Sequence, residues 1–91
     1  LPIFYQDVVE DVRLRIAPLC AEEALGGRFH STQTATPQAD GSVLVAFRAS
    51  GMRELAWHLF SWGDKVQILA PERLKSMMAE QLGLALAVHS S

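Results

Sequence analysis

The sequence predicts an α+β fold of the ferredoxin-like class, a βαββαβ sandwich with an additional C-terminal helix. Two stretches, 11–17 and 42–49, alternate polar and apolar residues with the period of two that is typical of half-buried strands. Two others, 50–62 and 71–89, place apolar residues three and four apart, which favours helices with one buried side. The elements follow in the order strand, helix, strand, strand, helix, strand, helix.

The first predicted strand is 11–17. Its apolar side chains face one way and its arginines the other, namely Val12, Leu14 and Ile16 against Arg13 and Arg15. Pro18 stops this strand, and 19–25 is predicted to be a short helix. Gly26 and Gly27 end that helix, because glycine readily takes the left-handed conformation found after helix ends.

The next two strands are predicted to form a hairpin. The threonine-rich stretch 31–38 suits an edge position, since Pro37 lacks the N–H group that an interior strand donates. The turn Asp40-Gly41 leads into strand 42–49. The two faces of that strand carry Val43, Val45 and Phe47 on one side and Leu44, Ala46 and Arg48 on the other. Right-handed crossovers then place the first and third strands side by side in the centre of the sheet.

The second helix is expected to begin after Ser50, a good N-cap residue, and to end at Gly63. Its buried stripe consists of Met52, Leu55, Ala56, Leu59 and Trp62. The fourth strand, 65–69, turns Val66 and Ile68 toward the core.

The last helix is expected to start with Pro71 at its first position and to run to about His89. Its core stripe is Leu74, Met77, Met78, Leu82 and Ala85. Three further apolar residues exceed what one small core uses and predict an interface with a partner subunit or another domain: Leu84, Leu86 and Val88. Trp57 lies at the margin of the apolar arc of the second helix, where it fits either the edge of the core or an interface anchor.

Composition limits the possible functions. The chain has 91 residues, enough for one domain, and its net charge of −2 argues against a general attraction to nucleic acid or anionic membranes. The single Cys20 favours a reducing, cytoplasmic compartment. No apolar run reaches the ~20 residues of a membrane span. The histidines and Cys20 match no zinc-binding spacing, so neither a metal nor a cofactor is predicted.

Four stretches resemble the C-terminal extension (WCX) domain of WYL-domain bacterial transcriptional regulators. They are VRLRIAP (12–18), ADGSVLVAFRAS (39–50), ELAWHLFSWGDKVQILAPERLKSMM (54–78) and LALAVH (84–89). In that family a winged helix and a WYL domain precede this domain, so we expect 1–7 to be a linker and 8–91 to be the WCX domain. The family's HPSQ-like turn corresponds to 30–33, HSTQ, which lacks the proline, and the resemblance adds Gln33 to the candidate effector site.

The resemblance implies a regulator rather than an enzyme. In that family the C-terminal half senses a negatively charged effector, which is nucleic acid in some members, and helps the protein to dimerise. We therefore expect an effector-sensing and dimerisation module whose partners are a second copy, the upstream WYL domain and an anionic effector such as single-stranded nucleic acid. Promoter DNA would be bound only through the winged helix, and no membrane partner is expected.

Three arginines form the sharpest candidate site, because the alternation sends Arg13, Arg15 and Arg48 to the sheet face that no helix covers. Lys65 and Gln67 would join them from the fourth strand. Guanidinium groups match phosphate and carboxylate oxygens, which predicts a site for an anionic effector. Two other interpretations stay open: the arginines meet carboxylates of a neighbouring domain, or they only keep this face solvated.

Two other functions share this fold. A free-standing domain like the RNA-recognition motif is the alternative, although such domains stack bases on aromatic residues of the first and third strands. The open face predicted here offers none. An acylphosphatase-like enzyme is rejected, because it would need an asparagine and the chain contains none.

Overall fold

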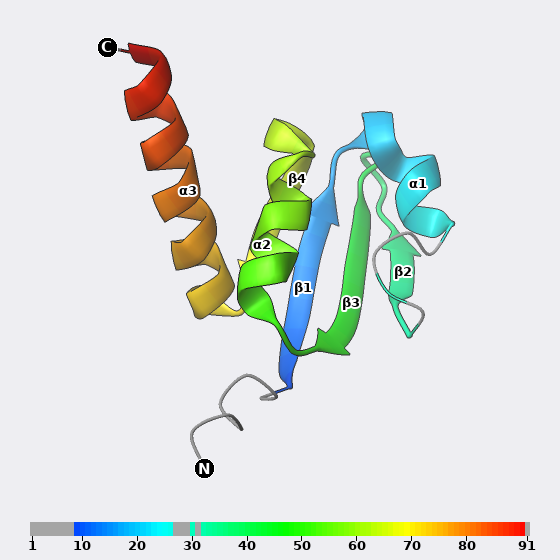
Figure 1. Cartoon of the computed structure of the whole chain (residues 1–91). Helices are drawn as coiled ribbons and strands as arrows, with labels where there is room; N and C mark the ends of the chain where they lie inside the picture. The colour runs from blue at the N-terminus through cyan, green and yellow to red at the C-terminus, as the bar shows by residue number, and fades with distance from the viewer. Residues whose placement is uncertain (1–8, 27–29, 31, 91) are drawn as a thin grey trace.

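A computed structural model describes residues 9–26, 30 and 32–90 of the chain. This part of the protein is an α+β fold with a four-stranded antiparallel sheet and three α-helices (Figure 1). The elements in chain order are β1 (Glu10–Ile16), the 3₁₀ turn η2 (Pro18–Cys20), α1 (Ala21–Leu25), β2 (Thr34–Pro37), β3 (Val43–Ala49), α2 (Met52–Phe60), the 3₁₀ turn η3 (Gly63–Lys65), β4 (Val66–Ala70) and α3 (Glu72–Ser90).

The strand order is β2-β3-β1-β4, and every neighbouring pair is antiparallel. The expected central pairing of the first and third strands is confirmed, since Leu14 lies opposite Val45 and Arg13 opposite Ala46. β2 pairs with only the first part of β3, because the pairing of the two strands ends where Thr34 lies opposite Ala46. The remainder of β3 therefore extends past the end of β2 within the described chain.

One face of the sheet carries the core. Alternate residues of β1 and β3 are buried there, as the sequence predicted: Val12, Leu14, Ile16, Val43, Val45 and Phe47. Helix side chains close this layer, with Ala24 of α1, Ala56 and Leu59 of α2 and Leu74 of α3 fully buried. The opposite face of β1 is exposed at every second residue. The helices therefore pack on one side and leave the other side open.

Several predicted element boundaries are wrong. Residue 31 lies outside the described residues, and within 32–38 the strand covers only Thr34–Pro37. The helix expected at 19–25 is a 3₁₀ turn followed by a short α-helix. α3 begins one residue after Pro71, whose carbonyl accepts the N–H groups of Leu74 and Lys75 at 3.1 and 3.2 Å. β4 starts at Val66 rather than at residue 65.

The expected cap of the second helix is also wrong. Gly51, not Ser50, is the N-cap of α2, and no side chain caps this end. Gly51 has φ 74°, a left-handed conformation that costs other residues about 1–2 kcal/mol. Gly63, expected to end the helix, comes three residues after Phe60 with φ 60°. Backbone conformation rather than side-chain capping therefore fixes the entry to α2.

Among the described elements, α3 is the one whose C-terminal part extends away from the sheet. It contacts α2 and β4, and Figure 1 shows its C-terminal turns extending past α2. Leu74 is fully buried and the two methionines that follow are half-buried. Leu82, expected in the core, is 49% exposed, because the helix has moved away from the sheet by that point.

Candidate functional site

The open face of the sheet holds the predicted arginines. Arg13 and Arg15 are exposed on β1, and the register places Ala46 and Leu44 opposite them on β3. Both β3 residues are half-buried, so they form a small apolar floor between the charged side chains. Gln67 faces the same way, since it lies opposite Arg15 on β4. The strand alternation thus brings the arginines to one face, as expected.

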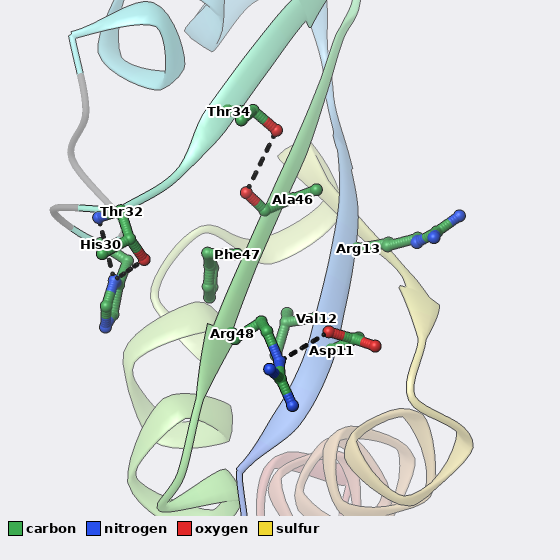
Figure 2. Close-up of a pocket in the computed structure, with 9 residues that line it drawn as sticks. All are labelled: Asp11, Val12, Arg13, His30, Thr32, Thr34, Ala46, Phe47 and Arg48. Carbon is green, nitrogen blue, oxygen red and sulfur yellow. Dashed lines mark hydrogen bonds and ion pairs between the residues drawn. The ribbon is translucent and has the colours of Figure 1, made fainter.

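Arg48 differs from the other two arginines because it already has an anionic partner. Its Nε lies 3.1 Å from Oδ1 of Asp11, the residue directly opposite it on β1. Figure 2 shows these two side chains turned toward each other, while Arg13 points away from both. The guanidinium groups of Arg13 and Arg48 therefore do not converge on one point (Figure 2). Sequence reasoning missed Asp11, although its position two residues before Arg13 placed it on the same face.

A cavity of about 560 Å³ opens where β3 extends past the end of β2. Its lining combines charged, hydroxyl and aromatic side chains: Asp11, Val12, Arg13, His30, Thr32, Thr34, Ala46, Phe47 and Arg48 (Figure 2). Arg13 and Arg48 both belong to it, whereas Arg15 lies farther along β1 toward the hairpin. The cavity lies at the free edge of β3 and takes side chains from both faces of the sheet, since Val12 and Phe47 belong to the buried set.

His30 forms one wall of this cavity. Its ring stacks on Phe47, with centroids 5.4 Å apart and planes 10° from parallel. The N–H of Thr32 donates to His30 Nδ1 at 3.1 Å, and Thr32 Oγ1 lies 2.7 Å from the same nitrogen. Because Nδ1 accepts a backbone hydrogen bond, the ring proton of the neutral histidine lies on Nε2. The sequence contained no signal for this stacked pair.

Gln33 has an internal structural role. Its Nε2 donates to the carbonyl of Ala24 at 2.5 Å, and its Oε1 accepts the N–H of His30 at 3.3 Å. The side chain thus ties the start of β2 to helix α1 and to the cavity wall. The expected contact of Gln33 with an effector stays a prediction.

Lys65 does not belong to β4, contrary to expectation. It ends the turn η3, where its Nζ lies 2.5 Å from Oδ1 of Asp64. The Asp64 carboxylate accepts a hydrogen bond from Lys65 and lies beside its positive charge, which lowers the pKa of Asp64 and raises the pKa of Lys65. With Asp64 beside it, Lys65 is less suited than Arg13 to capture an anion.

A second candidate surface lies between α2 and α3. A groove of about 360 Å³ there is lined by Trp57, Phe60, Gln81 and Leu84. Trp57 is 68% exposed, so its placement at the edge of the core is wrong and the interface interpretation remains. The predicted interface residues of α3 are also exposed, namely Leu84, Leu86 and Val88. Phe60, 38% exposed, is an additional apolar residue that sequence reasoning did not select.

Neither surface has the groups of a metal centre. Over the described ranges 9–26, 30 and 32–90, no three His, Cys, Asp or Glu side chains are placed to hold a metal ion. The same part of the chain contains no helix that combines the length and hydropathy needed to cross a membrane.

Comparison with protein-family models matches residues 9–86 to the WCX domain. The chain therefore belongs to the WCX domain family, which confirms the resemblance found in its sequence. WCX is a domain associated with transcription regulation and is not an enzyme family. A search of curated proteins finds no match to the chain.

Proposed function

We propose that this WCX domain is the effector-sensing and assembly module of a bacterial WYL-family transcriptional regulator. The observation that carries the proposal is the open sheet face, where Arg13 and Arg15 are exposed beside a cavity of about 560 Å³. Guanidinium groups on a rigid sheet are suited to phosphate or carboxylate oxygens, because their donors are held in a planar fork. The effector in this proposal is anionic, and single-stranded nucleic acid is a candidate.

The proposal assigns the domain to the ferredoxin-like class, which the β2-β3-β1-β4 order and the helices on one face support. In the regulator, the upstream WYL domain would cover the open face and close the effector between the two domains. Promoter DNA would be bound by the winged helix. An RNA-recognition-like function receives no support from the described sheet, since the open positions of β1 and β3 hold Asp11, Arg13, Arg15, Leu44, Ala46 and Arg48 and no aromatic residue.

Assembly is assigned to the α2–α3 side. The groove beside Trp57 and the end of α3 expose large apolar side chains, whose burial would contribute about 25 cal/mol per Å². The second half of α3, 81–90, contains no Asp, Glu, Lys or Arg. An uncharged helix with apolar residues on opposite sides is typical of a helix enclosed by a partner. A second copy of the domain is the proposed occupant.

The effector assignment is tested in the full-length regulator by fluorescence anisotropy with a single-stranded oligodeoxythymidine. Arg13→Ala should weaken binding about tenfold, since each charge-assisted hydrogen bond is worth roughly 1.5–3 kcal/mol. Arg48→Ala should also weaken it. Arg53→Ala removes an exposed arginine of α2, outside the cavity, and should change little. Wild-type affinity should fall as salt is added.

Unchanged affinity in both Arg13→Ala and Arg48→Ala, with the fold intact, would overturn this assignment. The two arginines would then serve an interface or the solvation of the open face.

A further inference from the structure

Asp11 places a negative charge inside the candidate effector cavity. On β1 it precedes Arg13 by two residues, so both side chains leave the same face from Cα atoms about 7 Å apart. On β3 it faces Arg48, with Asp11 Oδ1 3.1 Å from Arg48 Nε. The lining of the cavity therefore combines a carboxylate with two arginines and is not a uniformly positive surface.

Stability does not account for this carboxylate. Both members of the ion pair have side chains that are 71% exposed, and such surface pairs contribute at most about 1 kcal/mol. Its main effect is on a ligand, which meets the negative charge of Asp11 in the cavity. A bare phosphate that enters the cavity is repelled by Asp11 and must compete with it for Arg48. Arg13, in contrast, has no ion-pair partner within the described residues.

A second carboxylate lies near Arg15, the arginine of β1 that is closer to the β2–β3 hairpin. Asp40 lies close enough to Arg15 for the arginine's charge to act on it, although the main cause of its lowered pKa is the Ser42 hydroxyl, which donates to the Asp40 carboxylate at 2.6 Å. Acidic groups thus lie at both ends of the arginine row, Asp11 beside Arg48 and Asp40 near Arg15. This pattern complements a ligand of mixed charge better than a simple polyanion.

We infer that Asp11 makes this site selective for a ligand that carries a cationic or hydrogen-bond-donating group beside its anionic group. The inference rests on the proposed function and specifies the ligand of the same cavity. The anion of the ligand pairs with Arg13, while its amino group pairs with Asp11. The cavity volume of about 560 Å³ lies within the range of roughly 300–1,000 Å³ that is usual for small-molecule sites.

Two matched probes test this selectivity: O-phosphoethanolamine, which carries an ammonium group, and ethyl phosphate, which lacks one. Each is titrated into the ¹⁵N-labelled full-length regulator, in which the upstream domain can close the cavity, and the arginine Nε–H signals are followed by NMR. In the wild type, O-phosphoethanolamine should bind about three- to fivefold more tightly than ethyl phosphate, as an exposed charge pair allows.

Asp11→Asn should abolish this preference, because it removes the negative charge that attracts the ammonium group and repels the bare phosphate. Ethyl phosphate should bind Asp11→Asn more tightly than it binds the wild type. Asp64→Asn makes the same charge change in the turn η3, at the other end of β1 from Asp11, and should keep the wild-type preference. Core amide signals report whether each variant is folded.

Equal affinities for the two probes in wild type and Asp11→Asn, with clear shifts at Arg13, would overturn the selectivity and leave the effector face standing. If millimolar concentrations of either probe move no signal of Arg13, Arg15 or Arg48 in the full-length regulator or its Asp11→Asn variant, the effector face fails together with the inference.

Discussion

The two faces of strand β1 differ in both burial and charge. On β1, Val12, Leu14 and Ile16 have no exposed surface, while the residues between them are exposed and charged. The first set joins a hydrophobic cluster with the helices, and the open face beside it supplies Asp11 and Arg13 to the cavity. The comparison teaches that stability and recognition are divided between alternate residues, so each can be changed with little effect on the other.

The sharpest test of this division is the neighbouring pair Leu14 and Arg13. Leu14→Ala removes a fully buried side chain from the centre of the sheet and should lower the free energy of unfolding by about 2–5 kcal/mol. Arg13→Ala, one residue away on the open face, should change it by less than about 0.5 kcal/mol. Urea denaturation measures both values. Similar losses in the two variants would break the comparison.

On the helical side of the sheet, the groove between α2 and α3 is exposed to solvent. Leu84→Gln should leave the unfolding free energy of the monomer nearly unchanged, because Leu84 is 65% exposed. It should weaken self-association about tenfold, since a buried leucine contributes roughly 1.5–3 kcal/mol. Sedimentation equilibrium measures this change.

Leu19→Gln is the matched control for that prediction, because Leu19 is 77% exposed in the turn η2 and lies far from the groove in sequence. Equal weakening in both variants would show that general surface hydrophobicity, and not this groove, drives association. A wild-type chain that stays monomeric at high micromolar concentration would contradict the assembly proposal itself.

The open face should contribute little to stability even where it contains an ion pair. A double-mutant cycle with Asp11→Asn and Arg48→Gln should give a coupling energy of about 0.2–1 kcal/mol that shrinks as salt is added. A coupling energy well above this range that does not change with salt would show that the ion pair stabilises the fold. It would argue against a ligand-binding role of the open face.

The smallest expected effect concerns the β2–β3 turn. The buried Ser42 donates to Asp40 from its hydroxyl at 2.6 Å and from its N–H at 2.9 Å, and these bonds hold the pKa of Asp40 below its ordinary value. A lowered folded-state pKa stabilises the fold above the unfolded pKa, and this contribution is lost as pH falls through the folded value. In Ser42→Ala the pKa of Asp40 should rise, as a ¹³C-NMR titration of the carboxylate would show.

Much of this arrangement could be predicted from the sequence because strand alternation is local. Whether Leu14 or Arg13 faces the core follows from a period of two, and the same period placed Arg48 on the open face. The spacing of Met52, Ala56 and Leu59 likewise predicted the buried side of α2, and all three residues are buried. The order of the elements and the family resemblance were also predictable, because both depend on short stretches of sequence and not on tertiary contacts.

The sequence by itself determined which side chains share a face, whereas the tertiary structure decided which of them meet. The Asp11–Arg48 pair depends on the register between β1 and β3, which lie far apart in the chain. Gln33 became a tie to Ala24 only because β2 starts beside α1. Trp57 is exposed because α3 runs past α2 without covering it, and no local periodicity specifies the angle between two helices.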